Sequence, residues 1–228
     1  MKIKQKSDYI CIIMSESGTN KKSRASKIFG ILEAEYPDAK CHLNYQNAFQ
    51  LLVSTILAAQ CTDERVNMVM GPLYKKYKTP QDILNAKPEA LEKELSSINF
   101  YRNKTKSVIN ASKALVEKHG GKVPKTMEEL TELAGVGRKT ANVVLGNVFG
   151  VPAIMTDTHL NRVTQRLGLA DTDVPDKIEM ELKEIISPNK QVKFSHIIGE
   201  HGRQICKAKK PLCSECAVNK LCPSAFKV

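Results

Sequence analysis

The chain has 228 residues, of which 42% are hydrophobic and 26% charged, and its formal net charge is +11. This length suits one large domain or two small ones, and the composition is that of a globular protein with a sizeable core. The positive charge favours a polyanionic partner: nucleic acid first, with ribosome-like or anionic-membrane association as lesser alternatives. Tryptophan is absent and only 5% of residues are aromatic, which argues against binding by an array of stacked aromatic side chains.

The sequence shows no membrane span, and its N-terminal stretch shows no targeting signal. No apolar run approaches the ~20 residues of a membrane span, and the stretch from Tyr9 to Met14 is too short for a secretory signal. We therefore expect no membrane partner. With nucleic acid as the favoured partner, we expect a location in the cytoplasm on the nucleoid if the source is a prokaryote, or in the nucleus or mitochondrion if it is a eukaryote. Residues 1–23 are basic and polar, so we expect a disordered extension, with Met14 as an alternative start.

Apolar residues recur at helical spacing along most of the chain, and no stretch alternates with a period of two for long enough to build a sheet. The stretch 47–59 is apolar on most sides, which is typical of a central core helix. Thr79 before Pro80 starts one helix, and Gly120-Gly121 ends another. We predict an all-α protein with helices at 26–35, 47–59, 63–74, from Pro80, at 88–95, 103–119, 126–133, 138–148, 158–167, 175–186 and from 192 towards 206.

A glycine turn between two of these helices is the most informative stretch. Thr126 and Glu129 have the spacing of a capping box and start the short helix before it. Gly135 and Gly137 then form a Gly-x-Gly turn, which lets the backbone approach another molecule closely. Helix, turn and the N-terminus of the next helix together point free N–H groups outward, so this stretch predicts a phosphate-binding site.

Lys139 stands in the first turn of the second helix, where the helix dipole is unfavourable for a cation. In the plain interpretation this lysine is solvated or touches a phosphate. Alternatively, the same field, with some burial, favours the neutral amine that a nucleophilic lysine needs. Asp157, a short loop further on, is expected to cap the next helix, and this structural role is compatible with that of a catalytic carboxylate.

Four of the seven cysteines crowd into seventeen residues near the end of the sequence: Cys206, Cys213, Cys216 and Cys222. In a cytosolic protein such clustering indicates a metal site more often than disulfides. Four thiolates suit either a tetrahedral zinc or an iron–sulfur cluster, and the spacing alone does not decide between them. The first loop of the cluster is basic, which indicates either a solvated charge run or a surface that meets phosphates: Lys207, Lys209 and Lys210.

Leu-Ala-Gly-Val-Gly-Arg-Lys-Thr-Ala-Asn-Val-Val-Leu at 133–145, followed by Thr-Asp-Thr-His at 156–159, resembles the helix-hairpin-helix and catalytic loop of the endonuclease III family of DNA glycosylases. The cysteine spacing of x6, x2, x5 is similar to that family's loop for one 4Fe–4S cluster. The resemblance covers about residues 26–223 and implies a two-lobed fold. A six-helix domain at 41–151 would carry the hairpin, and a second lobe of 24–40 and 152–228 would carry the cluster.

The resemblance also implies roles for particular residues. Lys139 would be the nucleophile and Asp157 its carboxylate partner, on opposite walls of a cleft between the lobes, whereas His159 is expected to be structural. One departure is Ala134, where the family usually has proline. The residues of the hairpin implied as DNA contacts are Gly135, Val136, Gly137, Arg138 and Thr140.

Two further loops resemble family segments that contact the DNA. Gln60 would fill the gap left by an extruded base, and Asp63 would be its neighbour in the base pocket. Phe100 would wedge the opposite strand, although Asn99 stands where the family generally has glycine.

The function implied is that of a monomeric DNA glycosylase and AP lyase, acting on oxidised pyrimidines in duplex DNA and nicking the strand 3′ to the abasic site. Duplex DNA with damaged bases or abasic sites would be its partner. Two alternatives remain open: a mismatch-specific monofunctional glycosylase of the same superfamily, and a non-catalytic DNA-binding or redox-sensing iron–sulfur module. The second alternative leaves Lys139 and Asp157 without a role.

Overall fold

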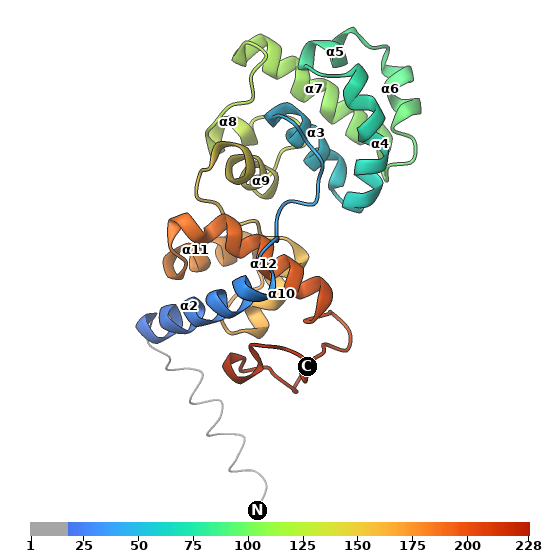
Figure 1. Cartoon of the computed structure of the whole chain (residues 1–228). Coiled ribbons are helices and arrows are strands. Elements are labelled where there is room, and N and C mark those ends of the chain that lie inside the picture. The colour runs from blue at the N-terminus through green and yellow to red at the C-terminus, as the bar shows by residue number, and fades with distance from the viewer. Residues whose placement is uncertain (1–17) are drawn as a thin grey trace, which may run out of the picture. The chain divides into compact units, whose positions relative to one another are not determined.

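The computed structural model describes residues 18–228, and within them it contains helices, turns and loops but no strand. The predicted all-α class is therefore confirmed. The expected start at Met14 lies outside the described residues. The chain divides into two compact units: Cys41–Ala153 forms one, and the segments before and after it form the other (Figure 1).

The unit Cys41–Ala153 contains seven helical segments, the number that the residue pattern predicts, whereas the family resemblance implies six; Pro80 and Pro88 each open a short helix of their own. The segments are α3 (Ala48–Ala58), α4 (Asp63–Lys76), α5 (Pro80–Asn85), α6 (Pro88–Glu94), α7 (Tyr101–His119), α8 (Met127–Thr131) and α9 (Arg138–Phe149).

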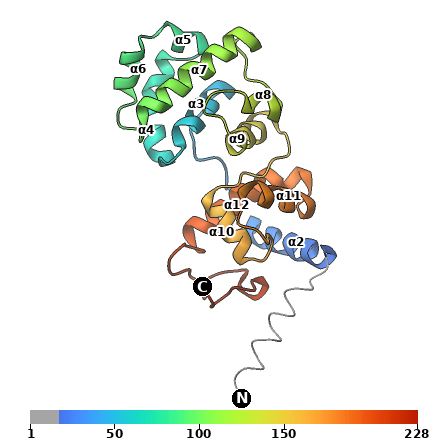
Figure 2. The same cartoon turned by 180° about the vertical axis from the view of Figure 1, so that it is seen from behind.

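Helix α3 is the centre of this unit, as its apolar sequence predicts. Every residue from Phe49 to Leu57 is buried, and the helix packs against α4, α7 and α9 (Figure 2). Asn47 caps it by accepting a hydrogen bond from the Gln50 N–H at 3.0 Å. A helix buried on all sides fixes the positions of both its ends, and the loop after its C-terminal end carries Gln60.

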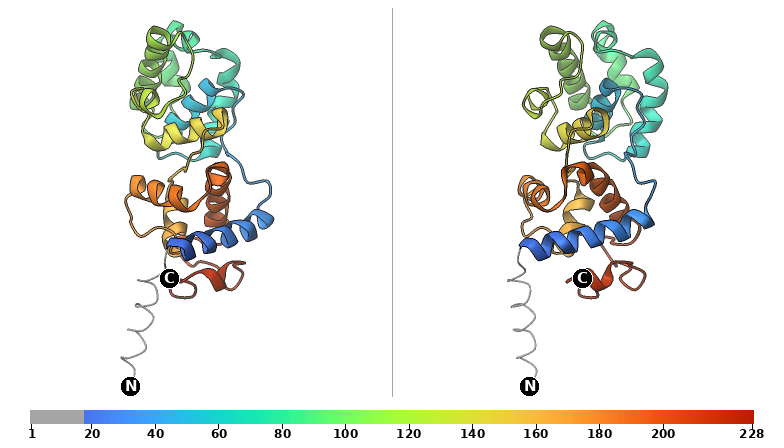
Figure 3. Two further views of the ribbon diagram at one scale, coloured as in Figure 1. Left: turned by 90° about the vertical axis from the view of Figure 1, so that its left-hand side faces the viewer. Right: turned by 60° about the vertical axis from the view of Figure 1, so that its left-hand side comes forward.

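The second unit contains α2 (Gly18–Glu35), α10 (Thr158–Arg166), α11 (Pro175–Ile185), α12 (Gln191–Gln204) and the 3-10 turns η1 (Pro188–Lys190) and η2 (Asn219–Leu221). Helix α12 packs against α10 and α2, with the Phe29 and Phe194 rings stacked at 6.3 Å between centroids. Figure 3 shows the C-terminal loop beside α2, where Arg24 donates to the Leu221 carbonyl at 3.3 Å.

One sequence prediction for this unit is wrong. Residues 18–23, expected to belong to a disordered extension, form the first turns of α2. The physical reason lies in the partners of its basic side chains. Lys21 pairs with Asp171 at 2.7 Å, and Arg24 donates to the Gly168 carbonyl at 2.9 Å. These contacts join residues far apart in the sequence, so composition alone cannot reveal them.

Candidate active site and cysteine loop

The glycine turn is held between α8 and α9 as predicted. Thr126 caps α8, since its hydroxyl accepts from the Glu129 N–H at 3.3 Å and donates to the Glu129 carboxylate at 2.7 Å. This differs from a full capping box, in which the Glu side chain would accept from the backbone of the capping residue. Helix α8 ends at Thr131, and Val136 is buried beneath the turn.

The two glycines of the turn have different reasons to be glycine. Gly135 has φ +77°, and a Cβ built on it would lie 2.8 Å from Cβ of Ser107 on α7. Both the backbone conformation and the close approach of α7 therefore exclude a side chain there. Gly137 has φ −95° and nothing within 4 Å of its Cβ position. The chain itself leaves the space above Gly137 open.

This difference gives a matched pair of variants. Gly135→Ala is expected to lower the free energy of unfolding by about 1–3 kcal/mol, because it forces a left-handed backbone onto alanine and a methyl into Ser107. Gly137→Ala is expected to change it by less than about 0.5 kcal/mol, since the weaker cap and the stiffer unfolded chain offset each other. Urea unfolding of both variants measures the difference; equal losses would contradict the packing described.

Helix α9 begins directly after this turn with an open N-terminus. No side chain caps it, and its first turn contains no acidic residue. Lys139 is its second residue and is exposed, while Arg138 and Thr140 are half-buried. The partial burial assumed for Lys139 in the sequence argument is therefore not found. An exposed amine next to a helix N-terminus is placed to meet a molecule that arrives from solvent.

Asp157 lies in the second unit, where it caps α10. Its carboxylate accepts from the Leu160 N–H at 2.7 Å and its side chain is half-buried. This is the structural role that the sequence predicts. Lys139 belongs to the other unit, so the Lys139–Asp157 pairing and the cleft between the lobes stay predictions. His159 Nδ1 lies 3.4 Å from Arg162 Nη2, in line with a structural role.

Gln60 and Phe100 share an unusual backbone conformation in two loops of the hairpin unit. Both lie in the left-handed region, with φ of 54° and 57°, which costs a non-glycine residue about 1–2 kcal/mol. Both side chains are exposed, that of Phe100 by 63%. Asn99 donates from Nδ2 to the Gln60 carbonyl at 2.8 Å and so joins the two loops. Asp63, the first residue of α4, follows Gln60 by three positions and is half-buried.

Lys104, a residue that sequence reasoning missed, joins the two helices that flank these loops. Lys104 is 7% exposed and donates from Nζ to the Leu57 carbonyl, near the end of α3, at 2.8 Å. Burial lowers the pKa of Lys104. A signal was present in the sequence, because Lys104 is a lysine near the start of a helix, which is the feature that singled out Lys139.

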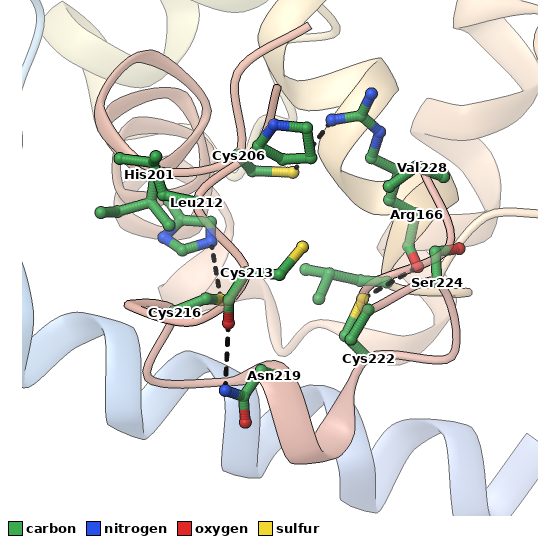
Figure 4. A pocket seen from close by; sticks show the side chains of 14 residues that line it. Arg166, His201, Cys206, Leu212, Cys213, Cys216, Asn219, Cys222, Ser224 and Val228 are labelled. Atoms are coloured by element: carbon green, nitrogen blue, oxygen red, sulfur yellow. Dashed lines mark hydrogen bonds between the residues drawn. The ribbon is translucent and has the colours of Figure 1, made fainter. Parts of the chain in front are cut away.

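The four cysteines of the C-terminal loop line one common pocket. Figure 4 shows their sulfur atoms surrounding this space rather than meeting at one point. In agreement, no three His, Cys, Asp or Glu side chains among residues 18–228 are arranged to hold a single metal ion. The loop is braced by Asn219, which donates to the Cys213 carbonyl at 3.1 Å. The four thiols are thus gathered by a structured loop.

Two basic groups of this unit face the sulfur atoms. Arg166 Nη1 lies 3.5 Å from Cys206 Sγ, and His201 Nε2 lies 3.5 Å from Cys216 Sγ. Burial lowers the pKa of His201 to about 4, so the ring is neutral near pH 7. Its Nδ1 lies 3.3 Å from the Tyr36 hydroxyl. If Tyr36 donates to Nδ1, Nε2 carries the ring proton and donates to Cys216.

Two of the four thiols, those of Cys216 and Cys222, are disfavoured as free anions. Burial raises the pKa of Cys216 and of Cys222, and the neighbouring cysteines raise both further. Cys222 accordingly donates as a thiol to the Arg166 carbonyl at 3.3 Å. Four clustered thiols become thiolates together only when a strongly positive group compensates their charge, which is the chemistry of metal ligands.

The basic loop between the first two cysteines is anchored from α10. Arg166 donates to the Lys207 carbonyl at 2.7 Å and to the Ala208 carbonyl at 3.0 Å. Lys207, Lys209 and Lys210 are exposed, and Lys210 has a left-handed backbone with φ 54°. The loop therefore presents three cations on a backbone that the fold fixes.

Comparisons with known proteins agree with this geometry. Residues 53–188 match the model for "HhH-GPD superfamily base excision DNA repair protein". Endonuclease III of Synechocystis sp. is 47% identical over 207 residues, which cover 90% of this chain and 94% of that protein. The structure of a trapped endonuclease III–DNA covalent intermediate superposes with a TM-score of 0.84 at 40% identity, covering 88% of this chain and 95% of that chain. A thermostable thymine-DNA glycosylase superposes with a TM-score of 0.78 at 24% identity, which shows a shared fold alone.

Proposed function

Because the chain belongs to the endonuclease III family, whose members are bifunctional DNA glycosylases and AP lyases for oxidised pyrimidines in base excision repair, we propose that Lys139 forms the covalent intermediate and that Asp157 assists it. The observation that supports this assignment is the exposed amine of Lys139 at the uncapped N-terminus of α9. No helix within residues 18–228 has the length and apolar character needed to cross a bilayer.

The substrate partner in this proposal is duplex DNA that carries a damaged base or an abasic site. The sugar C1′ of a stacked nucleotide is out of reach, so the damaged nucleotide has to leave the stack. Gln60 would occupy the gap, Phe100 would wedge the opposite strand and Asp63 would lie beside the extruded base. The exposure of Gln60 and Phe100 supports their part of the assignment.

The chemistry then proceeds through the amine. Lys139 Nζ bonds to C1′ while the bond from C1′ to the base breaks, and the electron pair leaves with the base, which takes up a proton. Opening of the sugar ring gives a Schiff base between Lys139 and C1′. Removal of a proton from C2′ expels the 3′ phosphate, which nicks the strand, and water then releases Lys139.

Asp157 would act on the charge that develops in this reaction. Positive charge builds on the sugar as the base departs, and a carboxylate held at a fixed position stabilises it without reorganisation. The cap to Leu160 uses one carboxylate oxygen, Oδ1, at 2.7 Å. The second oxygen is therefore available for the substrate sugar or for the Lys139 amine.

The hairpin would hold the DNA backbone next to the reacting sugar. Its contacts in this proposal are Gly135, Val136, Gly137, Arg138 and Thr140, with N–H groups of the α9 N-terminus meeting a phosphate. The open space above Gly137 supports a close approach at that point. Lys207, Lys209 and Lys210 would add phosphate contacts that carry no sequence preference.

The four C-terminal cysteines fit an iron–sulfur cluster by their chemistry and arrangement. Thiolates are the ligands of such clusters, and four sulfur atoms that surround a common space suit one thiolate per iron. We assign Cys206, Cys213, Cys216 and Cys222 as the ligands of one 4Fe–4S cluster that fixes the basic loop. Elemental analysis separates this assignment from a zinc site, with about four irons per chain expected against about one zinc.

Product analysis on three duplexes tests the proposed function against its alternatives. The protein is expected to release an oxidised pyrimidine and nick that strand, to nick a duplex with an abasic site, and to leave a mismatched but undamaged duplex intact. Base release without nicking would point to a monofunctional glycosylase. Binding without either reaction would point to the non-catalytic module and overturn the proposal.

A further inference from the structure

We propose that Asn99 is a positioning residue that couples Gln60 and Phe100, so that the two side chains engage the duplex as one preorganised unit. The inference rests on the proposed function, because it gives Gln60 and Phe100 their role at the damaged site.

The starting observation is the matched backbone of the two loops. Gln60 follows α3 and Phe100 precedes α7, and both have left-handed φ angles. Residues of this kind persist only when the surrounding structure holds them, and they cluster at functional sites. Each loop has its own internal support: Cys61 N–H donates to the Ala58 carbonyl at 3.1 Å, and Tyr101 N–H donates to the Ile98 carbonyl at 3.1 Å.

Asn99 supplies the link between the loops at the position of the two exposed side chains. Its Nδ2 donates to the Gln60 carbonyl at 2.8 Å, and Asn99 is the chain neighbour of Phe100. A carbonyl partner requires the amide to present its NH₂ group, so the side chain orientation is fixed by chemistry. A glycine at this position has no side chain with which to make this hydrogen bond.

The link is separate from what holds the helices together. Lys104 already joins α7 to the end of α3 through the Leu57 carbonyl at 2.8 Å. Asn99 is exposed, whereas Lys104 is buried. Loss of the Asn99 amide should therefore leave the helices in place and free the Gln60 backbone relative to Phe100. DNA binding would then have to order that backbone, and ordering on binding lowers affinity.

The test is a double-mutant cycle read by fluorescence anisotropy on a duplex with one tetrahydrofuran abasic-site analogue. Asn99→Ala is expected to raise Kd about fivefold, the value of about one net hydrogen bond. In the Gln60→Ala background the same replacement is expected to change Kd by less than about twofold, because the Gln60 side chain that Asn99 positions is already absent. Asn99→Gly provides a second variant without the amide and with the same expectation.

Two controls separate positioning from folding. Asn85→Ala removes an exposed asparagine that pairs with Gln81 on α5 and should leave Kd unchanged. The thermal unfolding midpoint of Asn99→Ala should stay within about 2 °C of the wild type, since exposed substitutions change stability little.

The outcomes distinguish the two proposals. An unchanged Kd for Asn99→Ala and Asn99→Gly, or the same loss in both Gln60 backgrounds, overturns the coupling while leaving the glycosylase assignment intact. A lower unfolding midpoint in step with the weaker binding overturns it too, since the residue would then be merely structural. A wild-type protein that does not prefer the abasic duplex over an undamaged one overturns the proposed function itself.

Discussion

Replacing Lys139 by alanine is expected to abolish both base excision and strand nicking, with a fall in rate of at least about 10⁴-fold, as the loss of a nucleophile that begins a covalent pathway would cause. The amine forms the new bond to C1′ in the proposed pathway, and no other step substitutes for it. Single-turnover excision on a duplex with one oxidised pyrimidine measures the effect. Lys139→Gln, which keeps most of the side-chain length, should be equally inactive.

The fold and the DNA affinity should survive this change. Lys139 is exposed, and exposed substitutions usually change the free energy of unfolding by less than about 0.5 kcal/mol. We therefore expect Lys139→Ala to bind the abasic-analogue duplex within about tenfold of the wild type, allowing for one lost cation near phosphate. Excision by Lys139→Ala at a rate close to that of the wild type would show that Lys139 is a phosphate contact and not the nucleophile.

The second large effect is expected from Asp157→Asn. Asparagine caps helices about as well as aspartate, so α10 should keep its cap to Leu160 and the unfolding midpoint should not move. The carboxylate is lost, however, and the excision rate should fall by about 10²- to 10³-fold, as when one group that stabilises transition-state charge is removed. Excision rate and unfolding midpoint, measured on the same preparation, separate the two roles of this residue.

Asp157→Ala is the matched comparison, because it removes the cap and the carboxylate together. It should lose activity like Asp157→Asn and in addition lose about 1 kcal/mol of stability. If Asp157→Asn retained full activity while Asp157→Ala did not, the residue would serve the helix alone. The assignment of a catalytic carboxylate would then be wrong.

Local signals allowed much of the fold to be predicted. Thr126 before α8, Thr79 before α5 and Asp157 before α10 each cap the helix that their sequence context predicts. A cap is a hydrogen bond between residues about three positions apart, so it can be predicted from a short stretch of sequence. The turn at Gly135 could be predicted because it too is a local feature, whereas the close approach of Ser107 to Gly135 could not.

Contacts between distant residues account for what sequence reasoning missed. The Asn99–Gln60 and Lys104–Leu57 hydrogen bonds join residues 39 and 47 positions apart. Asn99 appeared only as a departure from the family, whereas the structure gives its side chain a defined partner. The prediction that Lys139 is partly buried was wrong for a related reason. The exposure of a side chain at a helix end depends on what packs around that end and not on the helix itself.

The measurement that tests the central claim most directly is borohydride trapping followed by peptide mapping of the adduct. The wild-type protein is incubated with a duplex that carries one oxidised pyrimidine, the intermediate is reduced, and the peptide attached to DNA is identified by mass spectrometry. We predict a covalent complex whose only modified residue is Lys139 and which is absent from Lys139→Ala. A complex that persists in Lys139→Ala, or an adduct on another amine, would contradict the proposed mechanism.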